Sequence, residues 1–388
     1  MVQLGCEVLE DAPPAWLRHA RLGLLANQAS VNRSFDHVLS VIQRLGGKIC
    51  YLFTPQHGFY AEKQANMQES PDDWHSPLQI PIISLYSHVR QPSLEVLRKI
   101  DVLVVDLPDV GTRVYTYSTT MGLCMEAAAK AGVKVVVLDR PNPINGLGIE
   151  GNLLNPDFRS FVGWYPVPMR HGLTMGEFAR YVVQRCRVAS ELEVVPMKGW
   201  QRASFFASTG LPWVFPSPNM PTWETSLLYP GMVLLEGTNV SEGRGTTLPF
   251  QVFGAPFIDQ QELARYLRRF DLEGVILRPI SFEPVFDKWQ GQTCHGFQVH
   301  VTNLEKFRPL RLGLAICQGL FQLHGDRFQW LDPPYEYEYE KLPIDIILGD
   351  GTVREQLERG VDPVELEADW QPALESYRSE RADCLLYQ

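Results

Sequence analysis

The stretch DVLVVDLPDVGTR, residues 101–113, holds the two features that decide the fold. Its first half is a short apolar run, and its second half is a polar loop that opens with Asp106. A run of this length, bounded by turn residues, is typical of a strand that is buried on both faces of a parallel sheet. Similar runs occupy residues 21–26, 48–54, 81–85 and 133–139. Together these runs predict a parallel sheet.

Segments of helical period separate the apolar runs. Apolar residues recur at i, i+3, i+4 and i+7 from Val38 to Leu45, and a similar repeat extends from Tyr117 to Ala128. Thr174 followed by Glu177 forms a capping box that predicts the start of a later helix. The alternation of strands and helices predicts an α/β fold with a Rossmann-like parallel sheet.

The pattern changes near Gly254, where we place a domain boundary. Asp259 and Glu262 predict a capped helix, residues 297–302 alternate like a half-buried strand, and residues 310–321 have helical period. We therefore expect a Rossmann-like catalytic domain over residues 1–254 and a smaller α+β domain over residues 255–388 that closes a cleft. The alternation of Tyr and Glu at residues 335–340 is predicted to be an exposed strand edge.

The composition argues against two kinds of binding partner, nucleic acids and membranes. With 35 Lys and Arg against 45 Asp and Glu, the net charge of −10 would repel a nucleic-acid backbone. No run approaches the roughly 18 to 20 apolar residues of a membrane span, and the first 25 residues lack the features of a secretion signal. We expect a cytoplasmic protein with reduced core thiols, the alternative being a mature secreted form that has lost its signal. A homodimer is left open.

Polar loops follow four of the predicted strands at one edge of the sheet. They carry Asn27; Gln56, His57 and Glu62; Asp106, Asp109 and Arg113; and Asp139, Arg140 and Asn142. Ligands of open parallel sheets bind at this edge, because loops and helix N-termini converge there. Singly, Asp106 or Asp139 could be a local cap and His57 a core histidine. Their joint occurrence indicates a functional site.

A fifth polar loop, residues 236–247, lies near the expected boundary. It contains Glu236, Asn239, Glu242 and Arg244, and its glycines let the backbone approach a ligand closely. The alternative interpretation is a surface turn. Its place in the chain favours the cleft between the domains.

Several familiar sites are absent from the sequence. Residues 146–151 match GxGxxG but lie well past their strand and are not followed by a helical pattern, so they do not predict a dinucleotide site. The chain has no P-loop lysine motif, no HExxH and no GxSxG. Because the histidine spacing offers no metal pair on one helix, we expect neither a cofactor nor a metal.

A longer set of motifs resembles the exo-β-N-acetylmuramidase family, formerly a domain of unknown function. The motifs are LxNQAS (25–30), PQHGF (55–59), DLPDVGTRVYTY (106–117), LDRPNPING (138–146), FVGWYPVPMRHGLTMGE (161–177), PSPNMPT (216–222) and EGTNVSEGRGTTLPF (236–250). The resemblance implies a Rossmann-like domain, a smaller C-terminal domain and an active site between them. It also implies release of N-acetylmuramic acid from the non-reducing end of peptidoglycan fragments.

The implied substrate assigns roles to the polar residues. Its lactyl carboxylate would suit Arg113, Arg140, Arg170 or Arg244, and its hydroxyls and acetamide would suit Asn27, Asn142, Asn219 and Asn239. We take Gln56, Asp109, Asp139, His171 and Glu236 as further binding candidates. Trp164, Trp213 and Trp223 are candidates for stacking on the sugar. Because glycoside cleavage normally needs a general acid and a second carboxylate, the catalytic candidates are Glu62, Asp106 and Glu242, with His57 positioning them.

One departure affects the expected chemistry. Relatives carry PEHGF where this chain has PQHGF, so Gln56 stands where they have Glu. An amide cannot donate a catalytic proton as a carboxylic acid does. Either the acid role has moved, for example to Glu62, or the substrate has changed, or the protein binds muropeptides without cleaving them. A metal-dependent amidohydrolase built on His57 and His171 is a third hypothesis.

Overall fold

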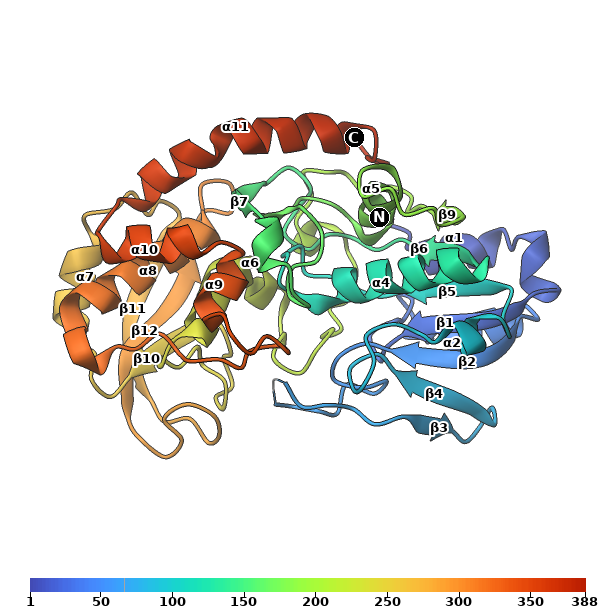
Figure 1. Cartoon of the computed structure of the whole chain (residues 1–388), viewed down its shortest axis with the longest axis horizontal. Helices are drawn as coiled ribbons and strands as arrows, with labels where there is room; N and C mark the ends of the chain where they lie inside the picture. Colours follow the sequence, from blue (N-terminus) through green and yellow to red (C-terminus); the bar gives the residue numbers. More distant parts are fainter. Residues whose placement is uncertain (66) are drawn as a thin grey trace.

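A seven-stranded sheet forms the N-terminal half of the molecule (Figure 1). The computed structural model describes residues 1–65 and 67–388. The strand order is β3-β4-β2-β1-β5-β6-β9, and every neighbouring pair is parallel except β3 and β4. The strands are β1 (Arg21–Ala26), β2 (Lys48–Thr54), β3 (Asp73–His75), β4 (Ile80–Ser84), β5 (Val102–Asp106), β6 (Lys134–Leu138) and β9 (Leu192–Val195). The five predicted strands are confirmed, each within one residue at either end.

Helices cover both faces of this sheet, because side chains alternate along the buried strands. Leu24 of β1 and Val104 of β5 point to the face covered by α1 (Gly5–Asp11) and α2 (Val38–Arg44). Leu25 and Val105 point to the other face, which is covered by α4 (Thr116–Ala131) and α5 (Met175–Gln184). The short α3 (Leu94–Leu97) packs beside α4. The predicted capping box is confirmed, since Thr174 accepts from the Glu177 amide and Glu177 accepts from the Thr174 amide.

The C-terminal half has a three-stranded antiparallel sheet surrounded by helices. Its strands lie in the order β10 (Val252–Ala255), β12 (Cys294–Val301) and β11 (Val275–Phe282). The helices are α6 (Trp223–Met232), α7 (Gln260–Leu267), α8 (Pro309–His324), α9 (Pro343–Leu348) and α10 (Gly351–Glu358). The predicted cap at Asp259, the strand near residue 299 and the helix near residue 315 are confirmed.

Helix α6 precedes the expected boundary yet packs against α8. A Cβ atom at Gly231 would lie 1.8 Å from the Pro309 carbonyl oxygen, and one at Gly313 would lie 2.3 Å from the Gly231 carbonyl oxygen. Only glycine permits this approach of the two backbones. The boundary at residues 254/255 stays a prediction, although α6 belongs by its packing to the C-terminal half.

The last helix returns to the N-terminal half. Helix α11 (Pro363–Ala382) runs across both halves, and the residues after it lie beside α5 (Figure 1). The Tyr387 hydroxyl donates to Asp139 Oδ2 at 2.5 Å, and the Leu386 amide donates to Glu177 Oε1 at 2.9 Å. Residues from the far end of the sequence thus complete polar contacts of the first sheet.

Two further sequence interpretations concern local structure. The GxGxxG string leads into β7 (Glu150–Leu153), which pairs with β8 (Pro168–Arg170), so it does not open a helix. The prediction of an exposed strand edge at residues 335–340 is wrong. Tyr335 and Glu336 are buried and a turn bridges Tyr335 to Glu338, whereas Tyr339 and Glu340 are exposed.

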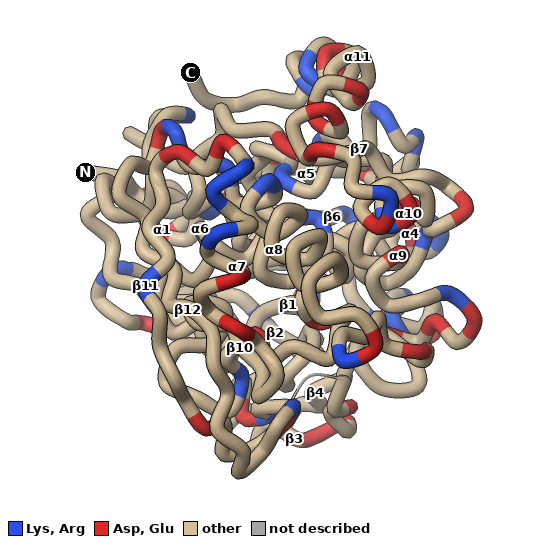
Figure 2. Tube along the Cα trace, turned by 90° about the vertical axis from the view of Figure 1, so that its left-hand side faces the viewer, with Lys and Arg blue, Asp and Glu red and all other residues tan. Residues whose placement is uncertain are grey.

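Charged residues of both signs are mixed along the chain, and α11 carries both (Figure 2). Within the described residues, every helix is too short or too polar to cross a bilayer.

Candidate active site

A pocket lies where loops of the N-terminal half meet the C-terminal half, and we call it the central pocket. The empty space within it, open solvent included, is about 400 Å³. Its lining comes from the loop after β2, the start of α4, the 217–220 loop, α6 and later segments. The lining residues are Gln56, His57, Val114, Tyr115, Thr116, Val162, Ser217, Asn219, Met220, Tyr229, Glu236, Arg244, Phe250, Tyr335 and Glu336.

The first carboxylate of the central pocket is Glu236. Arg244 Nη2 donates to Glu236 Oε1 at 2.6 Å, and the Tyr335 hydroxyl donates to Glu236 Oε2 at 2.6 Å. Arg244 also approaches Glu242, with 3.1 Å between Nε and Oε1. Although Arg244 is buried, its Nη1 has no hydrogen-bond partner among the residues that the structure describes. One donor of this guanidinium is therefore available to a ligand.

The second carboxyl group is Glu336, which the sequence analysis did not select. The Tyr86 hydroxyl donates to Glu336 Oε2 at 2.7 Å, and Gln56 Nε2 donates to Glu336 Oε1 at 3.1 Å. Burial raises the pKa of Glu336 to about 7, against the lowering effect of these two donors. A carboxyl group in this environment keeps its proton to near-neutral pH.

His57 and Gln56 line the same pocket through an unusual loop. His57 has a φ of 76° and its Nδ1 lies 2.7 Å from the Lys63 carbonyl oxygen. Burial lowers the pKa of His57 to about 4, so the ring is neutral at physiological pH. The Thr116 hydroxyl donates to Gln56 Oε1 at 2.9 Å, which orients the amide so that its NH₂ group faces Glu336.

The three carboxylates expected to be catalytic lie outside the central pocket. Glu242 lines an adjacent outer pocket; burial favours its neutral form, but the Lys288 ammonium and Arg244 guanidinium hold its pKa below the ordinary value. Asp106 is fully buried in an ion pair with Arg140. Glu62 is exposed. These positions favour none of the three for proton donation, and their catalytic roles stay predictions.

Two arginines expected to bind substrate direct their terminal nitrogens to other parts of the protein, although Nε of each has no hydrogen-bond partner among the described residues. Arg113 Nη1 donates to the Asn152 and Val167 carbonyl oxygens, and its Nη2 donates to those of Ile347 and Leu348. Burial lowers the pKa of Arg113 to about 10. Arg170 forms an ion pair with Glu150, at 2.7 Å between Nη1 and Oε1. Both arginines therefore connect separate segments of the protein interior.

The remaining binding candidates divide between the central pocket and the protein interior. Asn219 lines the pocket and holds Gln64. Asn27 instead donates to the Pro216 carbonyl, Asn142 to that of Leu173, and Asn239 to that of Arg327.

Asp139 caps the α5 region through the Gly176 amide and the Thr174 hydroxyl, and burial raises its pKa to about 6. His171 Nε2 faces Asp109 Oδ2 at 3.5 Å, away from His57, so these two histidines do not share the central pocket. Trp164, Trp213 and Trp223 are not among its lining residues.

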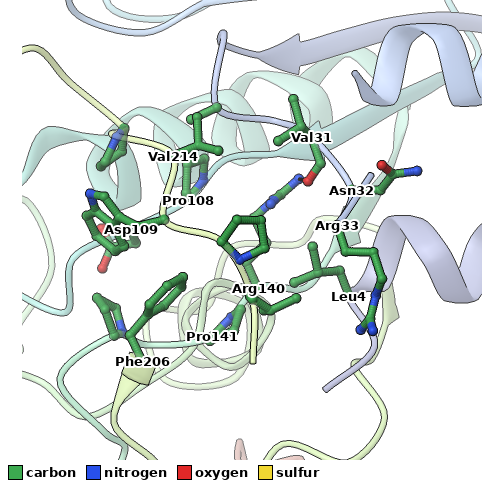
Figure 3. Close-up of a pocket in the computed structure, with 16 residues that line it drawn as sticks. Leu4, Val31, Asn32, Arg33, Pro108, Asp109, Arg140, Pro141, Phe206 and Val214 are labelled. Atoms are coloured by element: carbon green, nitrogen blue, oxygen red, sulfur yellow. Dashed lines mark hydrogen bonds between the residues drawn. The ribbon is translucent and has the colours of Figure 1, made fainter. Parts of the chain in front are cut away.

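A second, mostly apolar pocket occupies the carboxyl edge between β1, β5 and β6 (Figure 3). Arg140 and Asp109 lie in it beside Pro108, Pro141 and Phe206 (Figure 3). Arg140 is already bound to Asp106 and to the Val31 carbonyl oxygen. This is the crevice in which the sequence analysis expected the ligand, but the 206–216 segment covers it with apolar side chains.

Five residues of the central pocket were among the candidates predicted from the sequence: Gln56, His57, Asn219, Glu236 and Arg244. Glu336, Tyr335 and the tyrosines of the α4 and α6 regions were not among those candidates. The repeated Tyr-Glu pair was the available signal, because adjacent aromatic and acidic residues also suit a buried polar site.

Comparisons with known proteins cover the whole fold. A family model described as "Exo-beta-N-acetylmuramidase NamZ, N-terminal" matches residues 22–224, and one described as "Exo-beta-N-acetylmuramidase NamZ, C-terminal" matches residues 227–387. The chain is 39% identical, over 387 residues, to a protein of Bacillus subtilis (strain 168) named peptidoglycan beta-N-acetylmuramidase NamZ. This match covers 100% of the chain and 91% of that relative.

Two crystal structures of DUF1343 family proteins from Bacteroides fragilis NCTC 9343 have a similar fold. One superposes with a TM-score of 0.88 at 31% identity, and the other with a TM-score of 0.78 at 29% identity. Each match covers 100% of this chain and 99% of the other.

Proposed function

The chain belongs to the exo-β-N-acetylmuramidase family, and from this premise we propose that its central pocket is the active site of a glycoside hydrolase. The enzyme releases N-acetylmuramic acid from the non-reducing end of peptidoglycan fragments. Water cleaves the bond between the anomeric carbon of the terminal sugar and the oxygen of the next residue.

The observation that carries the proposal is the presence of two buried carboxyl groups in one pocket. Glu236 is ion-paired with Arg244, whereas the Glu336 carboxyl group accepts hydrogen bonds from a tyrosine and an amide among the described residues. Glycoside hydrolysis requires two carboxyl groups with different roles, one that donates a proton and one that supports attack at the anomeric carbon. Different environments at the two groups favour such a division.

Arg244 suits the feature that distinguishes N-acetylmuramic acid from other amino sugars. The lactyl group carries a carboxylate, and a guanidinium is the best partner for it because the two groups form charge-assisted hydrogen bonds. Arg244 lines the pocket, and its Nη1 has no hydrogen-bond partner within the described part of the chain, so this donor supports the assignment.

The alternative function is a sugar-binding protein that has lost its acid at Gln56. A pocket lined only by amides and arginines would favour that alternative. The central pocket instead places Glu336 at 3.1 Å from the Gln56 amide. This position favours the enzyme.

The test is hydrolysis of a chromogenic β-N-acetylmuraminide beside the matching N-acetylglucosaminide. We expect turnover of the muraminide alone, since only that sugar has the lactyl carboxylate. Arg244→Lys keeps the charge but loses the second donor, so KM should rise on the order of tenfold. Arg278→Lys, at an exposed position of β11, is the matched control. Equal turnover of both sugars, or an unchanged KM in Arg244→Lys, would remove the assigned role of Arg244.

The substrate partner is thus a peptidoglycan fragment. The cytoplasmic location and the homodimer considered from the sequence stay predictions.

A further inference from the structure

We infer that Glu336 is the proton donor to the leaving group, and that its turn holds it in the central pocket opposite the amide of Gln56. The inference rests on the proposed function, because a proton is needed at this place only if a glycosidic bond breaks there.

The backbone at Glu336 is fixed by its neighbours. Glu336 and Tyr337 have φ values of 45° and 69°, a conformation that residues other than glycine adopt only when the surroundings impose it. Tyr335 is held by Glu236, with 2.6 Å between its hydroxyl and Oε2. The Arg90 guanidinium lies 3.4 Å from the centre of the Tyr337 ring. Consecutive side chains thus anchor the turn, which makes it a rigid support for the carboxyl group between them.

The carboxyl group itself is oriented from two sides. Tyr86 and Gln56 each donate to a different oxygen of Glu336. Tyr86 is fully buried and its ring contacts Phe161, at 5.7 Å between centroids, so it cannot follow a moving carboxyl group. A general acid needs this fixed position, because proton transfer requires hydrogen-bond distance to the leaving oxygen.

The electrostatic surroundings favour a proton on Glu336. Burial raises its pKa to about 7 and the charge of Glu236 raises it too, while Tyr86, Gln56 and Arg90 lower it. The tyrosines 229, 335 and 337 also face this carboxyl group and are neutral, since burial raises their pKa values above the ordinary range. A carboxyl group with this pKa can both hold and give up a proton near neutral pH.

The reaction then balances with one water molecule. The Glu336 proton moves to the glycosidic oxygen as the bond from that oxygen to the anomeric carbon breaks, and the shortened fragment leaves as an alcohol. Water supplies the hydroxyl that ends on the anomeric carbon, and its second proton returns to the Glu336 carboxylate. No oxidant or further reactant is needed.

The experiment compares Glu336→Gln with wild type on two muraminides. One carries a sugar as leaving group, and the other carries a 2,4-dinitrophenyl group that leaves without a proton. We expect Glu336→Gln to lose on the order of 10²- to 10⁴-fold in kcat on the first substrate and far less on the second. Glu340→Gln, at an exposed position of the same segment, is the matched control and should retain full activity.

A second variant covers the case in which Glu336→Gln does not fold. Tyr86→Phe removes a donor that lowers the pKa of Glu336, so the alkaline limb of kcat/KM should move to higher pH. A limb that stays in place in Tyr86→Phe, or equal losses of Glu336→Gln on both substrates, would overturn the inference. If wild type hydrolyses neither substrate, the proposed function fails; if wild type is active and Glu336→Gln equals it, only the role of Glu336 fails.

Discussion

Replacing Arg113 by Met separates a structural role from the substrate-binding role expected of it from the sequence. The guanidinium donates four hydrogen bonds, two to carbonyls of the β7–β8 region and two to carbonyls at the end of α9. At about 1 kcal/mol each, these bonds contribute about 4 kcal/mol. Part of this is offset, because Arg113→Met also removes a charge whose burial is unfavourable, as the lowered pKa shows. We expect a net loss of about 2 to 3 kcal/mol in the free energy of unfolding.

The assay is urea unfolding, followed by tryptophan fluorescence and analysed at the first transition, together with KM for the muraminide in the folded variant. We expect KM to stay within about twofold of wild type, because Arg113 is not among the lining residues of the central pocket. Arg244→Met is the comparison, with a raised KM expected. The reasoning would be refuted by an Arg113→Met protein of wild-type stability whose KM rises about tenfold.

Three further results are expected. Gly313→Ala should lower the free energy of unfolding by about 1 to 3 kcal/mol in urea titrations, because the new methyl group meets the backbone of α6. A variant as stable as wild type would mean that α6 and α8 can move apart with little loss of free energy. Tyr387→Phe should lower the free energy of unfolding by about 1 to 2 kcal/mol, because it removes a hydrogen-bond donor from buried Asp139. Tyr339→Phe, at an exposed position, is the control. Equal urea midpoints of the two variants would contradict this prediction. Because the pKa of Glu336 is raised from 4.5 to about 7 in the folded protein, its contribution to stability is fully present below pH 4.5 and is lost as pH rises through about 7. Compared with Glu336→Gln, wild type should lose up to about 3 kcal/mol between these limits, and parallel pH profiles of the two proteins would contradict the shift.

The buried strands could be predicted from the sequence because their apolar runs have no other stable location. For the runs that end at Ala26 and Asp106, the length of the run and its flanking loops were sufficient to predict a strand. Strand β9 (Leu192–Val195) was missed because it is half-buried at the sheet edge and lacks such a run.

The site was harder to predict, because its residues come from distant parts of the sequence. The rule that ligands bind at the carboxyl edge of a parallel sheet led to Gln56 and His57, which line the central pocket. The same rule led to Asp106 and Arg140, which satisfy one another and form the base of an apolar crevice. Glu336 lies 280 residues beyond Gln56, and no local pattern indicates that they touch.

The return of α11 and residues 386–388 to the first sheet has a consequence for how the protein is made. While the ribosome is still producing the C-terminal half, Asp139 and Glu177 are without the Tyr387 hydroxyl and the Leu386 amide that complete their contacts. The first half therefore emerges with unfinished polar sites and matures only when the last helix docks. Residues 3 and 388 both bond to the segment around residue 200, through Lys198 and Arg202. A circular permutant that joins these two ends and opens between α10 and α11 would place α11 ahead of the first half, which could then finish before the second is translated.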